Sequence, residues 1–275
     1  MPSARRVLRS PGVTATSNAV AVVESYARRA RFARAEATAV RRPRLLHGLL
    51  RTGPHVVEIP CGAGHFLTEY ARAGATVTLV DACPEMLAAA VEHAANAGVP
   101  AEHTVPAVAY LHELEFLSEV ELVVAPNAAL NQLARQSSLT DMLTALRQAL
   151  RPGVEVLAQV ACTHPGGGVD SATFYDVARQ HRVWFPDRWF DPAHAGGAVL
   201  RRRRQQRDDD RLRIEFDYVD PAGHSLYTTT VELALFSAQQ LRDTFTAAGF
   251  VHVRLLAGQH GLSEVLATTD PGVQR

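Results

Sequence analysis

The segment EIPCGAGHFLTEY, residues 58–70, places an acid and two glycines where an apolar run gives way to a helical pattern. Gly62 and Gly64 would let the backbone approach a ligand that side chains would otherwise obstruct. A dinucleotide fingerprint needs a third glycine where this chain has Leu67. The carboxylate of Glu58 would also lie unfavourably close to an anionic pyrophosphate. The segment therefore favours a cationic ligand over a dinucleotide.

A second acid, Asp81, closes the next apolar run, 17 residues after Gly64. A carboxylate at the end of a strand can accept both hydroxyl hydrogens of a ribose. The alternative role for Asp81 is an N-cap for the helix predicted from Pro84. One acid at each of two adjacent strand ends, with a glycine turn between them, predicts a site for a nucleoside.

These residues need a parallel sheet to bring them together, and the apolar pattern predicts one. Four short, β-branched runs are typical of strands buried on both faces: 55–61, 76–82, 120–126 and 154–161. Helical segments lie between them, and several end at a glycine. This alternation predicts an α/β fold with a doubly wound, mostly parallel sheet.

The rest of the chain divides around that core. Residues 17–50 predict two helices broken near Pro43, and residues 163–236 predict a glycine-, proline- and aromatic-rich stretch followed by antiparallel strands. The α/β pattern resumes from residue 237. The expected organisation is an N-terminal helical lid (1–50), a nucleotide-binding core (51–162), an inserted antiparallel β lid (163–236) and the end of the core (237–275).

Four consecutive arginines, residues 201–204, raise the question of a nucleic-acid patch. A strand would place them alternately on its two faces, and acidic residues follow at once. We expect a solvated edge strand with salt bridges.

Composition excludes several classes of protein. The sequence contains no lysine, which pyridoxal-phosphate enzymes need for a Schiff base and P-loop proteins need for phosphate. Basic and acidic residues number 28 each, so no overall field attracts nucleic acid or an anionic membrane.

No long apolar segment or secretory signal is present, and we expect a cytoplasmic protein, monomeric or homodimeric. Three cysteines are too few for a disulfide framework or a four-thiolate zinc site, so we expect them to pack as apolar groups with no structural metal.

The residues quoted above resemble the class I S-adenosylmethionine-dependent methyltransferases. The resemblance covers residues 55–160 and, in outline, 237–269. Residues 58–64 match the family's E/D-x-G-x-G-x-G loop, with Pro60 in the first glycine place, and Asp81 matches its ribose-binding acid. The family's adenine-binding acid after strand three is replaced by residues 107–110, where backbone groups would have to serve.

The resemblance implies a Rossmann-like fold with seven strands and S-adenosylmethionine as cofactor. It implies that the loop and an acid near Glu58 hold the methionine part of the cofactor, with Met86 against the adenine. Asn127 would line the cleft between cofactor and substrate, with an N-cap as its alternative role. The expected cofactor-binding residues are Glu58, Pro60, Gly62, Gly64, Asp81, Ala82, Met86 and Asn127.

Aromatic faces attract a sulfonium cation, and the N-terminal helices and the insertion supply such faces. Tyr26 and Tyr175 are favoured because each also carries a hydroxyl. The expected catalytic residues are Tyr175, Tyr26 and Asn127. Any general base is left open among His164, His181, His194, Asp176 and Asp187.

Three functions remain open from the sequence. The leading hypothesis is methyl transfer to a small molecule of secondary metabolism, without nucleic acid or membrane. The alternative is cyclisation of S-adenosylmethionine itself, giving azetidine-2-carboxylate or 1-aminocyclopropane-1-carboxylate with methylthioadenosine leaving. A third hypothesis is a non-catalytic protein that binds S-adenosylmethionine.

Overall fold

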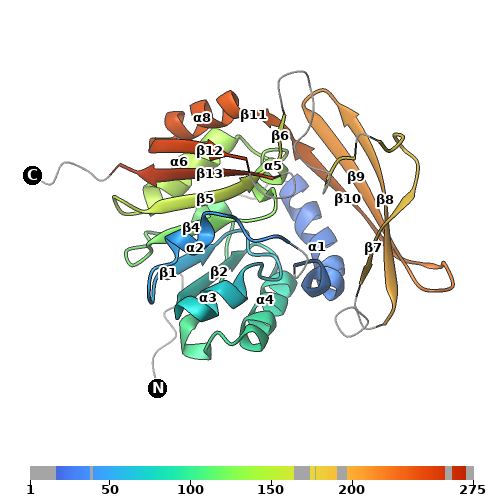
Figure 1. The fold of residues 1–275 in the computed structure, drawn as a ribbon, viewed down its shortest axis with the longest axis horizontal. Helices are drawn as coiled ribbons and strands as arrows, with labels where there is room; N and C mark the ends of the chain where they lie inside the picture. The colour runs from blue at the N-terminus through green and yellow to red at the C-terminus, as the bar shows by residue number, and fades with distance from the viewer. Residues whose placement is uncertain are drawn as a thin grey trace, which may run out of the picture.

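Two β-sheets lie on either side of helix α1 (Ser17–Ala37), as Figure 1 shows. The structure is a computed structural model that describes residues 17–37, 40–163, 174–176, 178–190, 197–257 and 262–270. Its larger sheet forms the core, and its smaller sheet belongs to the insertion. Helix α1 contacts both α4 (Pro84–Ala97) of the core and β10 (Ser225–Ala234) of the insertion.

The larger sheet has seven strands in the order β12-β13-β5-β4-β1-β2-β3. Their bounds are β1 His55–Glu58, β2 Thr76–Asp81, β3 Thr104–Val108, β4 Leu122–Ala125, β5 Glu155–Val160, β12 Phe250–Leu256 and β13 Ser263–Thr269. Strands β1 to β5 pair in parallel, and β13 is antiparallel to both of its neighbours. The predicted doubly wound, mostly parallel sheet of seven strands is confirmed.

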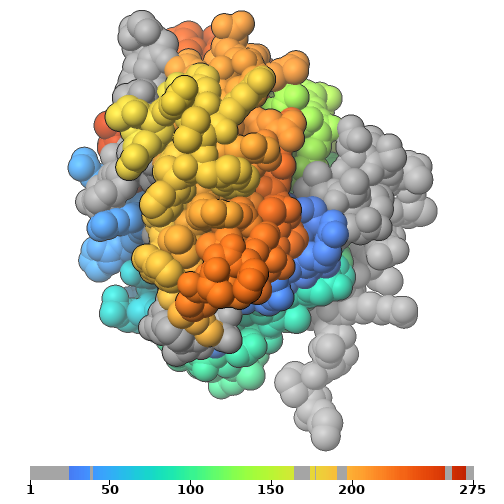
Figure 2. All heavy atoms as spheres, turned by 90° about the vertical axis from the view of Figure 1, so that its right-hand side faces the viewer, coloured from blue at the N-terminus to red at the C-terminus, as the bar shows by residue number. Residues whose placement is uncertain are grey.

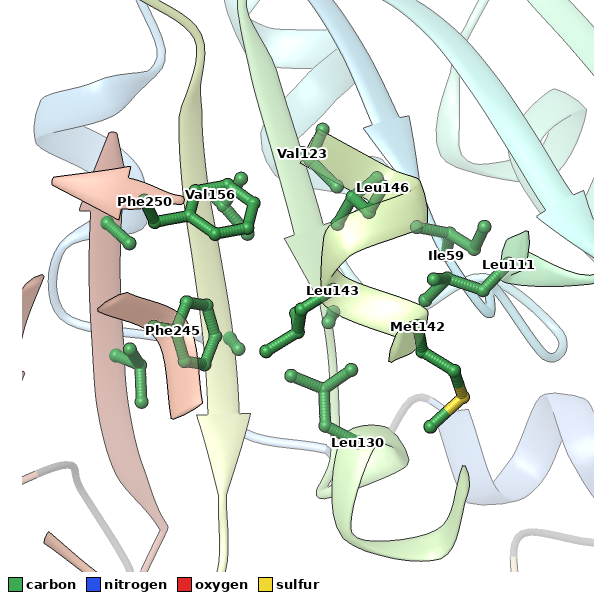
Figure 3. Packing of buried hydrophobic residues seen from close by; sticks show 14 of the residues in the cluster. Ile59, Leu111, Val123, Leu130, Met142, Leu143, Leu146, Val156, Phe245 and Phe250 are labelled. Atoms are coloured by element: carbon green, nitrogen blue, oxygen red, sulfur yellow. The ribbon is translucent and has the colours of Figure 1, made fainter. Parts of the chain in front are cut away.

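Helices cover both faces of this sheet and bury its apolar side chains. Besides α4 they are α3 Leu67–Ala73, α5 Ala129–Leu133, α6 Leu139–Ala149 and α8 Ala238–Ala247, with single 3-10 turns η1 Ala101–His103 and η2 Leu111–Glu113. Figure 3 shows Phe245 of α8, Leu143 of α6 and Val156 of β5 in one cluster of buried apolar side chains. Helices α3 and α4 end at Gly74 and Gly98 in the left-handed conformation, as predicted for helix C-termini.

The insertion forms a second, antiparallel sheet in the order β10-β9-β8-β7. Its other strands are β7 Phe185–Phe190, β8 Val199–Asp208 and β9 Arg211–Val219. Figure 2 shows these strands, in yellow and orange, spread over one face of the molecule with α1 emerging in blue beside them. Phe32 of α1 stacks on Tyr218 of β9 with ring centroids 4.4 Å apart, so helix and sheet share one apolar layer.

The expectation that residues 201–204 lie on a solvated edge strand is wrong. Strand β8 pairs with β7 on one side and with β9 on the other. The side chains do alternate: Arg201 and Arg203 are buried, whereas Arg202 and Arg204 pair with Asp217 and Glu215 on β9. An inner strand can bury arginines here because acids on neighbouring elements pair with them.

Buried polar side chains join the parts of the molecule. Asn131 of α5 donates from Nδ2 to the carbonyl oxygens of Ala161, at 2.9 Å, and Ala234, at 2.7 Å, and so joins the core to the insertion. The carboxylate of Glu264 on β13 accepts the backbone N–H groups of Arg44, at 2.6 Å, and Leu45, at 3.1 Å. That contact fixes the start of α2 (Leu46–Leu49), the short second helix on the far side of the break predicted near residue 43. Strands β6 (Cys162–Thr163) and β11 (Phe236–Ser237) pair in parallel where the chain enters and leaves the insertion.

All three cysteines are free and buried, as predicted. Among the described helices, none has the length and apolar character that a membrane span requires.

Candidate active site

A cavity of about 410 Å³ lies where the carboxyl ends of β1, β2 and β4 face the insertion sheet. One wall, the core wall, consists of the glycine turn after β1 and the residues after β2 and β4. The opposite wall, the insertion wall, comes from β7 to β10, and α1 closes the space between them. This is the position at which doubly wound sheets bind ligands, and the volume suits a cofactor with a small molecule.

Asp81 on the core wall is held by backbone donors. Its Oδ2 accepts the N–H of Gly62 at 2.8 Å and its Oδ1 accepts the N–H of Cys83 at 2.9 Å. Burial raises the pKa of Asp81, and the hydrogen bonds from Cys83 and Gly62 oppose that rise. The carboxylate lines the cavity with lone pairs remaining for hydroxyl donors. The helix N-cap position itself belongs to Cys83, so Asp81 supports α4 from two residues before that cap.

Glu58 does not line the cavity but lies fully buried behind the glycine turn. Its Oε1 accepts the backbone N–H of His65 at 2.8 Å, and its Oε2 accepts the hydroxyl of Tyr70 at 2.8 Å. The Nδ1 of His65 also lies 3.2 Å from Oε1. The acid at the head of the motif therefore shapes the turn and contributes a buried negative charge behind it.

The two glycines of the turn adopt backbone conformations that favour glycine. Gly62 has φ +53° and Gly64 has φ +77°, and a Cβ on Gly64 would lie 2.4 Å from Cδ1 of Leu67. His93 of α4 holds the turn in place, since its Nδ1 lies 2.9 Å from the carbonyl oxygen of Ala63 and 3.1 Å from that of Gly64. Both partners are acceptors, so this nitrogen carries the proton. Gly62 lines the cavity, whereas Gly64 lies behind it.

The remaining core-wall residues expected from the sequence line the cavity together. Ala82 and Met86 follow Asp81 on the same wall, and Pro60 lies at the turn. Tyr110, from the segment that replaces the family's adenine-binding acid, lies on the cavity as well. Of the predicted cofactor-binding residues, Pro60, Gly62, Asp81, Ala82 and Met86 therefore share one surface, whereas Glu58 and Gly64 lie behind it.

Asn127 lines the cavity at the end of β4 in a left-handed conformation, φ +51°. Its backbone N–H donates to Oε1 of Gln159 at 3.0 Å, and Nε2 of Gln159 donates to the carbonyl oxygen of Arg41 at 2.8 Å. The N-cap of α5 is Ala128, so the alternative role predicted for Asn127 is wrong. Gln159 thus ties the end of β4 to the segment after α1.

Of the two tyrosines predicted to be catalytic, Tyr26 lines the cavity and Tyr175 does not. The hydroxyl of Tyr26 accepts a hydrogen bond from Nε2 of Gln132. Burial raises the pKa of Tyr26, against the opposing charge of Arg29. The hydroxyl of Tyr175 lies 2.9 Å from Nε2 of His181, away from the cavity.

None of the base candidates that the structure describes lies on the cavity. Asp187 pairs with Arg201 at 2.6 Å, Asp176 pairs with Arg179 at 3.4 Å, and His181 faces Tyr175. His164 and His194 lie outside the described residues.

The insertion wall and α1 hold an ion-pair network that the sequence did not predict. Glu36 of α1 accepts from Arg29 at 2.7 Å and from Arg201 at 2.6 Å, and the hydroxyl of Tyr218 donates to the same carboxylate. Burial alone would raise the pKa of Glu36, but the charges of Arg29 and Arg201 outweigh it and lower the pKa from 4.5 to about 2. Glu36, Arg29 and Arg201 all line the cavity, together with Phe216. The one sequence signal for this network was the run of arginines at 201–204, because alternation along a strand must turn two of those side chains inward, where they need acidic partners.

The core wall fits S-adenosylmethionine on its own chemistry. Asp81 offers acceptor lone pairs beside a turn whose glycines leave backbone exposed, and Glu58 adds a second acidic charge behind it. Both features suit a nucleoside that carries a positive charge.

Comparison with known proteins agrees with this geometry. Residues 56–153 match the family described as "Methyltransferase domain". No curated protein matches the chain.

Solved structures with the same fold include three methyltransferases at low sequence identity. The CcbJ methyltransferase from Streptomyces caelestis is 17% identical, with TM-score 0.60, and the match covers 90% of each chain. CalS10 from Micromonospora echinaspora, an amino pentose methyltransferase involved in calicheamicin biosynthesis and solved with S-adenosylmethionine bound, is 19% identical with TM-score 0.57, covering 94% of this chain and 92% of that one. The sugar N-methyltransferase KedS8 from Streptoalloteichus is 17% identical with TM-score 0.58, covering 98% and 99%.

Proposed function

We propose that this chain, which carries a class I S-adenosylmethionine-dependent methyltransferase domain, methylates a small molecule held between its core and its insertion. The observation that carries the proposal is the cavity itself. The carboxylate of Asp81 and the glycine turn form one wall, and a separate polar and aromatic wall faces them. A non-catalytic binding protein would have no need for that second, differently built wall.

On the core wall, Asp81 would accept the ribose hydroxyls while Ala82, Met86 and Tyr110 surround the base. Gly62 would present its backbone to the methionine part of the cofactor. When bound, S-adenosylmethionine supplies an electrophilic methyl group on a sulfonium. Tyr26 would place its aromatic ring and hydroxyl oxygen beside that positive charge.

His65 is the imidazole that this cavity offers for an acceptor's proton among the described residues. Its Nδ1 faces the carboxylate of Glu58 at 3.2 Å, which orients the ring. With Nδ1 protonated, Nε2 is free to accept a proton. Glu36 lines the same cavity, but two arginines and a tyrosine already bind its carboxylate.

A small acceptor suits the dimensions of the site. Helix α1 and the insertion line the cavity opposite the core wall and would limit the access of water to it. The similar structures named above include an amino pentose methyltransferase of calicheamicin biosynthesis and a sugar N-methyltransferase. We infer a comparable role in secondary metabolism. We also infer that a single chain supplies the whole site, whether the protein is a monomer or a homodimer.

Product identity tests the proposal against the cyclisation alternative, which finds no support among those methyltransferases. The protein is incubated with S-adenosylmethionine alone and with a panel of small amines and hydroxyl compounds, and mass spectrometry identifies the purine product. Adenosylhomocysteine that forms only with an acceptor is the expected result. Methylthioadenosine formed at catalytic rates without an acceptor would overturn it in favour of cyclisation, and tight binding without any product would indicate a binding protein.

A further inference from the structure

Arg188 of β7 lines the cavity from the insertion wall and is half-buried there. Among the described residues, no carboxylate lies within ion-pair distance of its guanidinium. Burial lowers the pKa of Arg188 and the neighbouring charge of Arg201 lowers it further, against the opposing charges of Asp187 and Glu36. A cation that is partly removed from water beside another cation is unfavourable until an anion joins it.

The nearby carboxylates are already bound by other arginines. Glu36 accepts from Arg29 and Arg201. Asp187 lies 2.6 Å from Arg201 and 3.5 Å from Arg203. Among the described residues, the arginines of this wall therefore outnumber the carboxylates that bind them, and Arg188 is the arginine left without an ion pair.

A β-bulge turns Arg188 toward the cavity. The pairing of β7 with β8 shifts register between Pro186 and Arg188. Phe185 and Phe190 are both buried although they lie five positions apart, which strict alternation along a strand forbids. The extra residue puts Asp187 and Arg188 on the same inner side, and Trp189 points outward at 62% exposure. Bulges next to ligand sites commonly re-aim side chains in this way.

Arginines outnumber acids on this side of the cavity, where Glu36 is the acid among the described lining residues. Arg29, Arg41, Arg188 and Arg201 line the cavity, and Arg41 lies close enough to lower the pKa of Arg188 as well. Asp81, the acid on the opposite wall, is assigned to the cofactor. A guanidinium presents parallel N–H donors that match the two oxygens of a carboxylate or phosphate.

We propose that the methyl acceptor carries an oxyanion, a carboxylate or a phosphate, that binds Arg188 on the insertion wall. The inference rests on the proposed function, because it assumes that the core wall holds the cofactor. It names the chemical class of the acceptor and the residue that selects it.

Titration calorimetry on protein saturated with S-adenosylhomocysteine tests this proposal. That ligand fills the core-wall side of the cavity, and its own carboxylate occupies any anion site that belongs to the cofactor. Benzoate, phenyl phosphate and neutral benzyl alcohol are titrated at constant ionic strength. At least one of the two anions should bind about tenfold or more tightly than benzyl alcohol, and the stronger of them identifies the oxyanion. Arg188→Gln should abolish that preference, Arg188→Lys should keep part of it, and Arg211→Gln, on an exposed side chain of β9, should leave it intact.

Equal binding of all three probes by the unmodified protein would overturn the inference, even if Arg188→Gln failed to fold. A preference that survives Arg188→Gln would overturn it too. Loss of S-adenosylhomocysteine affinity in Arg188→Gln would also overturn it, by assigning the arginine to the cofactor. Failure of the unmodified protein to bind S-adenosylhomocysteine would instead refute the proposed function.

Discussion

The two walls of the cavity are built by different physical means. On the core wall, backbone N–H groups hold the carboxylate that we assign to the cofactor: Asp81 is fixed by Gly62 and Cys83. On the insertion wall, side chains hold one another: Glu36 of α1 is bound by Arg29 and Arg201. The first arrangement needs only a local motif, whereas the second needs α1 and the insertion to be docked together. The core wall should therefore tolerate changes in the insertion, and the insertion wall should depend on the fold of the whole molecule.

Removing the charge at the centre of the insertion wall should have the largest effect. Glu36→Gln leaves Arg29 and Arg201 partly buried with a neutral partner, and we expect the free energy of unfolding to fall by about 3 kcal/mol. Chemical denaturation measures this. The matched control is Glu92→Gln, because Glu92 is 71% exposed in its pair with Arg34, and it should lose about 0.5 kcal/mol or less. Similar losses in the two variants would show that the network does not hold α1 to the insertion.

Acid should weaken the same network. The pKa of Glu36 is about 2 in the folded protein against 4.5 for the free side chain. A lowered pKa means that the stabilisation is fully present above pH 4.5 and is lost as the pH falls toward about 2. The shift corresponds to about 3 kcal/mol in total. Denaturation curves across that window should show this loss in the unmodified protein and not in Glu36→Gln; parallel curves would contradict the assignment.

A smaller effect is expected when the support of the core wall is removed. His93→Ala deletes the donor to the carbonyl oxygens of Ala63 and Gly64 and loosens the turn without touching the cavity. We expect about a fivefold loss of affinity for S-adenosylhomocysteine, measured by calorimetry. His103→Ala is the matched control, because His103 lies in η1 and is not among the residues that line the cavity. An unchanged affinity in His93→Ala would mean that the turn keeps its shape without the histidine.

The smallest effect is predicted for Tyr175, which the sequence had suggested as catalytic. Its hydroxyl faces His181 and not the cavity, so Tyr175→Phe should keep the rate of methyl transfer within about twofold. Tyr26→Phe provides the contrast, since it removes a hydroxyl that lies on the cavity. A greater loss of methyl-transfer rate in Tyr175→Phe than in Tyr26→Phe would show that Tyr175 acts in catalysis after all.

The same contrast explains what the sequence could predict. The strands, the glycine turn and Asp81 carry local signals, because a buried parallel strand reads as an apolar run and the turn needs glycine within a few residues of it. Glu36 and Arg201 lie 165 positions apart, so nothing local joins them. Arg188 depends on a bulge that follows from pairing with β8, which its own segment does not encode. Even Glu58, found by its motif, was expected beside the ligand and lies behind the turn, because Tyr70 and His65 draw its carboxylate inward.

We assign the cofactor to the core wall and the acceptor to the insertion wall. Titrating S-adenosylhomocysteine into Asp81→Asn and Arg188→Gln tests this assignment directly. An asparagine must turn its NH₂ toward the N–H of Gly62 or Cys83, so Asp81→Asn should bind about a hundredfold more weakly. Arg188→Gln should bind within about twofold of the unmodified protein. Unchanged affinity in Asp81→Asn, or an equal loss in both variants, would contradict the assignment of the cofactor to the core wall.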